Sequence, residues 1–122
     1  MAQHNTTGNW GETIACEKLI VDGYAICERN FRIGHYEIDI IAMKGNRIVF
    51  VEVKTRTSTT SDPLDAIDNK KILRMVRAAN SYITTFNIRH EPQFDIITIV
   101  GTPDNYTLEH IPDAFYAPLT TR

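Results

Sequence analysis

The segment from Glu37 to Arg56, EIDIIAMKGNRIVFVEVKTR, constrains the fold of this chain more than any other, because it predicts a β-hairpin. Residues 37–43 are rich in isoleucine and residues 47–54 are rich in valine, as strands require. Gly45-Asn46 lies between the two runs, and glycine in the first central position favours a tight two-residue turn. The short turn gives the predicted hairpin a defined register.

This register brings acidic residues of the two strands together. Counting back from the turn, Asp39 is predicted to face Glu52, and Glu37 is predicted to face Lys54. Side chains alternate with period two along a strand, so these four residues share one face of the hairpin. Opposed residues have Cβ atoms roughly 4.5–5.5 Å apart, and like charges at that spacing are destabilising. The facing carboxylates of Asp39 and Glu52 therefore require an explanation.

Two explanations of the acidic pair are consistent with the residues around it. On a solvated sheet face, Glu37 and Glu52 would simply pair with Lys54. However, the face that carries Glu52 also carries Ile48 and Phe50, and the opposite face carries three valines, so the strand is predicted to be buried. Buried carboxylates must be paired, protonated or bound to a metal. We favour a metal site over a structural ion pair.

A helix is predicted over residues 9–22, upstream of the hairpin. Glu12 lies on the same face of this helix as Ala15, Cys16 and Leu19, because the four residues occur at positions i, i+3, i+4 and i+7. The inward position of Glu12 indicates a functional role. Alternatively, its carboxylate only favours the positive N-terminal end of the helix.

A polar segment over residues 55–69 follows the hairpin and predicts a mobile loop, and a second helix is predicted over residues 69–86. Asp68 is a suitable N-cap for this helix. The helix has an apolar stripe and a separate group of cations. The stripe consists of Ile72, Val76, Ala79, Ile83 and Phe86, and the cations are Lys70, Lys71, Arg74 and Arg77. These cations form either a solvated face or a surface that holds phosphates.

Three further runs predict strands over residues 24–29, 94–100 and 106–111. Residues 30–35 are expected to form a turn, and residues 112–122 are expected to form a tail. The predicted element order is therefore α-β-β-β-α-β-β. This order indicates an α/β fold in which a mixed sheet is flanked by helices.

The length of 122 residues suits one domain, which we place at residues 8–118, between a polar lead-in over residues 1–7 and a tail over residues 119–122. The net charge of −2 gives no global basic signal, so any nucleic-acid partner must be held by a local patch. Cys16 and Cys27 match no zinc or redox spacing, and we expect reduced thiols in a cytoplasmic protein. No membrane span and no signal peptide are predicted.

Glu12, Asp39 and the triplet Glu52-Val53-Lys54 line up with a known pattern. An Asp that is followed about a dozen residues later by Glu-x-Lys on a hairpin resembles the PD-(D/E)xK motif of restriction-endonuclease-like nucleases, although Ile38 stands where that motif has proline. The helix glutamate resembles that of the archaeal Holliday junction resolvase branch. More closely, the chain resembles the YraN-type (UPF0102) family of uncharacterised, predicted endonuclease-like proteins. The segments that carry this likeness are Gly11-Glu12, Gly23-Tyr24, Arg29-Asn30, Glu37-Ile38-Asp39 with Ile41-Ala42, Val49 to Arg56, and Phe94-Asp95.

The resemblance implies a restriction-endonuclease-like fold and Mg²⁺- or Mn²⁺-dependent hydrolysis of phosphodiester bonds in DNA, branched or otherwise structured. It implies that Asp39, Glu52 and the backbone carbonyl of Val53 hold the metal. Lys54 would orient the attacking water or stabilise charge on the phosphorane, and Glu12 would ligate through water or accept a proton. The residues expected to hold the phosphate backbone are Arg29, Arg32, Arg56, Lys70, Lys71 and Arg74.

Two other functions remain open at this point. The chain could keep the nuclease fold as a catalytically silent nucleic-acid-binding module, which predicts salt-dependent binding without cleavage and without a metal requirement. It could instead be an interaction protein that dimerises through the edge of its sheet. Junction-resolving relatives are dimers, so a homodimer is expected by analogy. Glu37 is expected to pair with Lys54 or Arg56.

Overall fold

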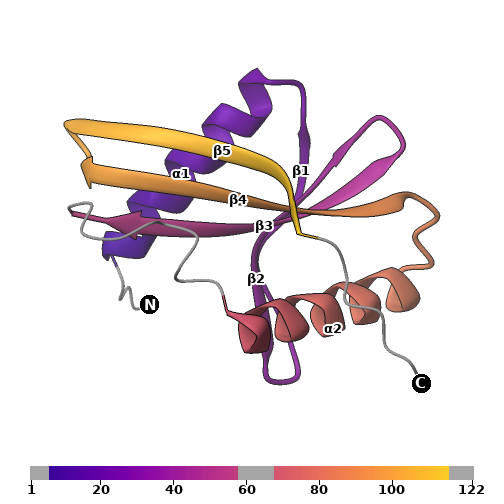
Figure 1. The fold of residues 1–122 in the computed structure, drawn as a ribbon. Coiled ribbons are helices and arrows are strands. Elements are labelled where there is room, and N and C mark those ends of the chain that lie inside the picture. The colour runs from indigo at the N-terminus through magenta and orange to yellow at the C-terminus, as the bar shows by residue number, and fades with distance from the viewer. Residues whose placement is uncertain (1–5, 58–67, 116–122) are drawn as a thin grey trace.

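The computed structural model describes residues 6–57 and 68–115, in which two helices and five strands are formed (Figure 1). In chain order the elements are α1 (Thr6–Val21), β1 (Ala25–Ile33), β2 (Tyr36–Lys44), β3 (Arg47–Arg56), α2 (Asn69–Thr85), β4 (Glu91–Thr102) and β5 (Asn105–Phe115). The predicted order α-β-β-β-α-β-β is therefore confirmed. Neither of the described helices has the length and apolarity needed to cross a membrane.

The five strands form one mixed sheet, in which they lie in chain order from β1 to β5. Neighbouring strands are antiparallel except β3 and β4, which run parallel. Parallel neighbours need a crossover connection, and this connection contains α2. The helices lie on opposite faces of the sheet, so the molecule has three layers (Figure 1).

The middle strand, β3, is buried on both faces, as its sequence predicts. Val49 and Val51 belong to the apolar cluster that includes α1, whereas Ile48 and Phe50 belong to the cluster that includes α2. Burying a side chain of this size contributes about 1.5–3 kcal/mol, so β3 anchors both helices. The predicted inner face of α1 is also confirmed, because its apolar members are buried. These members are Ala15, Cys16 and Leu19.

Several strands extend beyond their predicted ends. β1 continues to Ile33 through most of the predicted turn, so that only residues 34–35 connect it to β2. β5 continues to Phe115, which pairs with Phe94 of β4, although residues 112–122 were expected to form a tail. Proline is tolerated at residue 112 because β5 is an edge strand. Most of the predicted mobile loop, the first five residues and residues 116–122 lie outside the described part of the chain.

The buried face of α2 differs from the predicted stripe. Phe86, the predicted last member of that stripe, is the C-cap and remains 51% exposed. Tyr82 is buried instead, because its ring packs edge-on against the rings of Phe31 and Phe50. The buried residues of the helix are Met75, Ala78, Ala79 and Tyr82. The predicted N-cap is confirmed, since the side chain of Asp68 accepts a hydrogen bond from the backbone N–H of Lys71.

Asp95 of β4 is fully buried and holds the C-terminal half of β5 in place. Its Oδ1 accepts hydrogen bonds from the Gln93 side chain at 2.9 Å and from the backbone N–H of Asp113 at 3.0 Å. Its Oδ2 lies 2.7 Å from Nε2 of His110. The register of β4 and β5 shifts at this residue, so the carboxylate supplies bonds that the irregular ladder lacks.

Replacing Asp95 should therefore destabilise the fold strongly. In Asp95→Ala the His110 ring and the Asp113 N–H lose a buried partner, and we expect the free energy of unfolding to fall by about 3–5 kcal/mol. Urea denaturation measures the change. Asp104→Ala, in the exposed turn between β4 and β5, is the matched control and should stay within about 0.5 kcal/mol of the wild type. A loss below about 1 kcal/mol in Asp95→Ala would contradict this account.

Candidate functional site

The candidate site lies at the fork, which is the point where β2 and β3 separate. The paired residues run from the Gly45-Asn46 turn, in the predicted register, as far as Ile40 and Val51. Beyond this pair β3 continues beside β4, while β2 bends away towards α2 (Figure 1). The predicted cross-strand pairings of Asp39 with Glu52 and of Glu37 with Lys54 are therefore not formed, because the strands have already parted.

The side chain of Asp39 bridges the fork. Its Oδ2 accepts a hydrogen bond of 2.8 Å from the backbone N–H of Val53. A buried backbone N–H needs an acceptor, and β2 no longer pairs with β3 at this position, so the carboxylate replaces a ladder bond. The N–H and C=O of one strand residue point to the same side, so the Val53 carbonyl also faces the fork.

Glu52 is the buried acid of the site, with an exposed fraction of only 4%. Its Oε2 lies 2.9 Å from Nζ of Lys71, in the first turn of α2. The N-cap Asp68 fixes the start of that helix and thereby the position of Lys71. The structural ion pair that was the alternative explanation for Glu52 therefore exists, but its cation is Lys71 and not Lys54.

Glu12 reaches the site from α1, which approaches β3 closely. A Cβ on Gly11 would collide with the side chain of Thr55, so only glycine allows this approach without a shift. The Glu12 side chain is 13% exposed, and its Oε1 lies 4.0 Å from Nη2 of Arg29. The side chain of Asn30 lies close enough to the carboxylate to lower its pKa. Within the described part of the chain, Oε1 is nevertheless buried without a hydrogen-bond partner.

The three carboxylates of Glu12, Asp39 and Glu52, which we call the acidic site, influence one another electrostatically. Burial, followed by the negative charge of Glu52, raises the pKa of Asp39 to about 7. Burial also raises the pKa of Glu12, and the charges of Glu37 and Glu52 act in the same direction. The fold thus holds Asp39 and Glu12 where their ionised forms are disfavoured, and a bound cation would relieve this.

The ligand atoms of the site suit a hard divalent cation. Asp39 and Glu52 offer carboxylate oxygens and Val53 offers a carbonyl oxygen, and Mg²⁺ commonly uses one or two carboxylates and keeps several waters. In residues 6–57 and 68–115, no three side chains of His, Cys, Asp or Glu converge as metal ligands. A closed cage of the kind that structural zinc requires therefore does not fit these residues, whereas a largely hydrated Mg²⁺ or Mn²⁺ does.

The basic residues predicted to hold DNA have different surroundings. Arg29 lies beside Glu12 and is partly neutralised by it. Arg32 pairs at 3.7 Å with Glu37, its direct neighbour across the β1–β2 ladder, so Glu37 does not pair with Lys54 as predicted. The remaining predicted contacts lie at the end of β3 and on the first half of α2. These are Arg56, which is half-buried, Lys70 and Arg74, which are exposed, and Lys71, which pairs with Glu52.

A polar cavity of about 200 Å³ lies between α2 and the β1–β2 turn. Because Lys71 both lines this cavity and pairs with Glu52, the cavity adjoins the acidic site. Arg74 contributes a second cation. The lining residues are His35, Tyr36, Glu37, Lys71, Arg74 and Met75.

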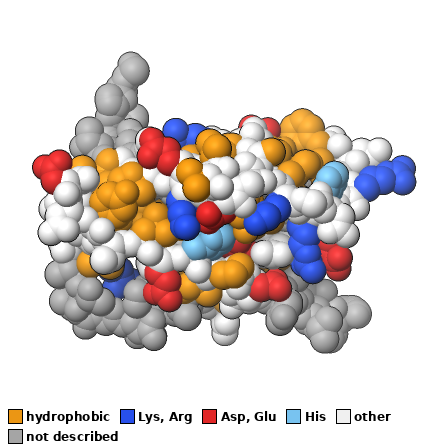
Figure 2. Space-filling view, turned by 90° about the horizontal axis from the view of Figure 1, so that it is seen from above, with side chains coloured by type: hydrophobic (Ala, Val, Ile, Leu, Met, Phe, Trp, Pro, Cys, Tyr) orange, Lys and Arg blue, Asp and Glu red, His pale blue; other side chains and the backbone are white. Residues whose placement is uncertain are grey.

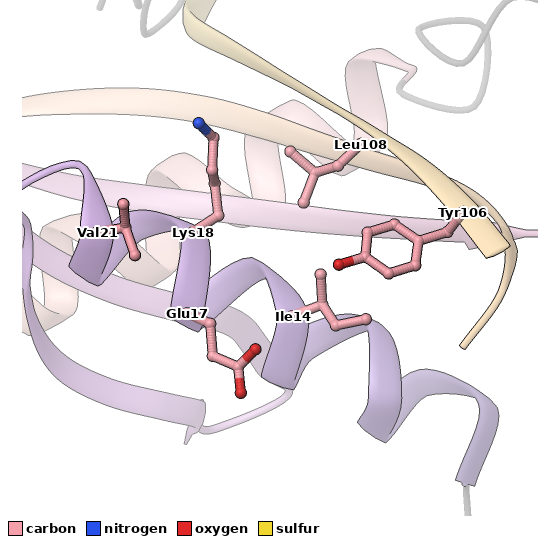
Figure 3. A pocket seen from close by; sticks show the side chains of 6 residues that line it. All are labelled: Ile14, Glu17, Lys18, Val21, Tyr106 and Leu108. Atoms are coloured by element: carbon pink, nitrogen blue, oxygen red, sulfur yellow. The ribbon is translucent and has the colours of Figure 1, made fainter. Parts of the chain in front are cut away.

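A larger cavity of about 350 Å³, between α1 and β5, has a different chemistry. Figure 3 shows Ile14 and Leu108 on its two sides, with the Tyr106 hydroxyl directed towards Ile14. It shares no lining residue with the acidic site. Its lining is mostly apolar, and the charges of Glu17 and Lys18 offset one another, so it does not suit a phosphate.

Two contacts of the acidic site were missed by the sequence analysis. Lys71 was predicted only as a phosphate contact, although its ammonium pairs with Glu52. Asn30 was expected in a turn but lies within β1 with a positive φ of 51°, a conformation that asparagine tolerates better than most residues. Its effect on the pKa of Glu12 places it beside the site.

The close approach of α1 can be tested at Gly11. In an open helix Gly→Ala stabilises by up to about 1 kcal/mol, but here the methyl group meets Thr55, and we expect a net loss of about 1–3 kcal/mol. Chemical denaturation of Gly11→Ala measures this loss. Adding Thr55→Ala removes the colliding atom, so the cost of Gly11→Ala should vanish in that background. A stabilised single variant would show that α1 does not contact β3 there.

The raised pKa of Asp39 predicts a pH-dependent stability. Between about pH 4 and pH 7 the folded protein keeps a proton that the unfolded chain has lost, so ionisation of Asp39 lowers stability progressively across this window. Asp39→Asn retains an acceptor for Val53 without the charge. We expect it to exceed the wild type by about 1–3 kcal/mol at about pH 8, with little difference near pH 4. Urea unfolding in EDTA is the measurement, and a pH-independent difference would contradict the assignment.

Known proteins resemble this chain over almost its whole length. The model of a family described as "Uncharacterised protein family UPF0102" matches residues 11–99. A UPF0102 protein of Bacteroides thetaiotaomicron is 48% identical over 120 residues, which cover 98% of this chain and 99% of that protein. UPF0102 protein FP2501 of Flavobacterium psychrophilum is 42% identical over 117 residues, which cover 95% and 98% of the two chains. The chain therefore belongs to the UPF0102 family, as its resemblance to the YraN-type proteins indicated.

Proposed function

We propose that this protein is a Mg²⁺- or Mn²⁺-dependent nuclease that hydrolyses phosphodiester bonds in DNA, branched or otherwise structured. The observation that carries the proposal is that Glu12, Asp39 and Glu52, which come from three elements, lie close enough at the fork of β2 and β3 for their charges to act on one another. Burial and mutual repulsion raise the pKa of Asp39 and of Glu12. Carboxylates perturbed in this way cluster at functional sites, because a fold that needs only stability gains nothing from them.

The residues of the site would have complementary roles in hydrolysis. When bound, the divalent cation supplies a polarised water molecule and offsets charge on the phosphate. Asp39, Glu52 and the Val53 carbonyl would hold that cation. Glu12, whose pKa is raised by burial, would accept the proton that the attacking water releases. Lys54, two residues beyond Glu52 on β3, would orient the water or stabilise charge on the phosphorane.

The proposed nucleic-acid surface lies on the α2 side of the fork. Lys70, Lys71 and Arg74 come from the first half of α2, and Arg56 comes from the end of β3. The view from above in Figure 2 instead shows acidic, basic and apolar side chains intermingled, without a continuous basic stripe among the side chains drawn in colour there. Phosphate contacts supply most non-specific affinity for DNA, so the α2 side is the better candidate.

Cleavage assays test the proposed roles. The wild type should cut at least one member of a panel of single-stranded, flapped and four-way-junction DNA when Mg²⁺ or Mn²⁺ is present. Asp39→Asn, Glu52→Gln and Glu12→Gln should each lower the rate by a factor of roughly 10²–10⁴. Glu17→Gln, on the exposed side of α1, is the matched control and should cleave normally. Unchanged cleavage in the three site variants would refute the assignment.

One observation favours a second function, that of a catalytically silent nucleic-acid-binding module. Glu52 already has a counter-ion, since Lys71 lies 2.9 Å away, and the ion pair needs no metal. The two functions differ in their response to Mn²⁺. A nuclease should gain thermal stability with Mn²⁺ as RT ln(1 + [L]/Kd), and Asp39→Asn should lose the gain. A silent module should bind nucleic acid in a salt-dependent manner and show no response to Mn²⁺.

A further inference from the structure

Lys71 lies at the boundary between two features of the molecule. Its ammonium is 2.9 Å from the Glu52 carboxylate, and its side chain also lines the polar cavity between α2 and the β1–β2 turn. Glu52 is almost fully buried at 5% side-chain exposure, whereas the Lys71 side chain is 32% exposed. The Glu52 side chain is therefore held within the sheet, whereas the partly exposed Lys71 side chain can change its rotamer.

A divalent cation and Lys71 would compete for the same carboxylate. The ammonium of lysine is a compact charge on a flexible four-carbon stem, and it can leave an ion pair by rotating about its side-chain bonds. A divalent cation close to Glu52 would repel the ammonium and also remove its partner. The charge of Lys71 must then be accommodated elsewhere, because burying an unpaired ammonium is costly.

The polar cavity offers that alternative place, and its chemistry suits a phosphate group. Lys71 and Arg74 lie three residues apart on one face of α2. His35 of the β1–β2 turn and Tyr36 at the start of β2 add polar groups. Two cations at one cavity attract an anion, and an arginine fork can bind phosphate oxygens in a bidentate manner. The single acid of the lining, Glu37, is paired with Arg32.

We propose that Lys71 couples metal binding at Glu52 to phosphate binding in the neighbouring cavity. Without metal, the ammonium neutralises Glu52. With metal, the ammonium turns into the cavity, where it and Arg74 hold a phosphate of the nucleic-acid strand beside the scissile one. This inference rests on the proposed nuclease function. The movement of Lys71 would make binding of the divalent cation and binding of the nucleic-acid phosphate cooperative. Coupling is reciprocal, so nucleic acid must strengthen metal binding by the same factor.

Metal affinity gives the first test. Calorimetric titration of the full chain with Mn²⁺, and the loss of the free Mn²⁺ paramagnetic resonance signal, measure binding without reference to cleavage. Lys71→Met removes the competing ammonium, so Mn²⁺ should bind roughly tenfold more tightly, within the 5- to 150-fold range usual for coupled sites. Lys71→Gln keeps a hydrogen-bond donor for Glu52, and it replaces Lys71→Met in this titration if Lys71→Met does not fold. Arg77→Met removes a cation from the exposed face of the same helix and should bind Mn²⁺ like the wild type.

Nucleic-acid affinity gives the second test. Fluorescence anisotropy with a thymidine oligonucleotide that contains phosphorothioate linkages should show tighter binding by the wild type when Mn²⁺ is added. In Lys71→Met the gain produced by Mn²⁺ should fall to less than about twofold, because the coupling residue is absent. Arg77→Met should retain the wild-type gain.

The outcomes separate the inference from the proposed function. If the wild type binds Mn²⁺ and Lys71→Met binds it equally or more weakly, the coupling is refuted while the nuclease proposal stands. If Lys71→Met retains the full Mn²⁺-dependent gain in oligonucleotide affinity, the coupling is likewise refuted. If the wild type binds no Mn²⁺ with or without the oligonucleotide, both proposals fail. If Lys71→Met binds Mn²⁺ more tightly and loses the Mn²⁺-dependent increase in oligonucleotide affinity, the coupling is supported.

Discussion

The hydrogen bond from the Val53 N–H to the Asp39 carboxylate is the contact on which the arrangement of this molecule depends. It forms where β3 leaves β2 and continues beside β4 alone. A strand that loses a neighbour exposes backbone groups that must find other partners, and an apolar side chain could not serve. The acid that satisfies the separated strand is therefore held at a half-buried position. The Asp39 side chain therefore has two roles, as a structural acceptor for the Val53 N–H and as a candidate metal ligand.

The acidic site carries an energetic cost that the rest of the fold offsets. Burial of Asp39 beside Glu52 disfavours the ionised pair, and Glu12 adds a third negative group from α1. Arg29 of β1 approaches Glu12, and Lys71 of α2 approaches Glu52, and the two cations reduce the repulsion only in part. The apolar clusters on both faces of β3 supply the stability that tolerates this strain. Such a balance is typical of sites kept for function.

The sequence predicted what depends on local pattern. The Gly45-Asn46 turn fixed the hairpin register, and helical spacing placed Glu12 on the inner face of α1. It did not predict the fork, because the separation of β2 from β3 depends on the pairing of β3 with β4, whose sequence lies beyond α2. Contacts between distant segments also set the position of Lys71 and the buried face of α2 around Tyr82. The extension of β5 required the side-chain bonds of Asp95, which no periodicity reveals.

The ion pair between Glu52 and Lys71 is compatible with both functions, because a lysine beside a carboxylate neutralises it whether or not a metal later replaces the lysine. The other two acids distinguish the functions better. A silent module has no use for a carboxylate whose Oε1 is buried without a hydrogen-bond partner, as in Glu12, or for one whose pKa is raised to about 7, as in Asp39. Replacing Asp39 with asparagine, which keeps an acceptor for the Val53 N–H, or Glu12 with glutamine would remove the cost of the buried charge. The unpartnered oxygen of Glu12 and the disfavoured charge of Asp39 both lie near Glu52, which Lys71 pairs. These two unfavourable features are the physical reason to favour a metal-dependent reaction.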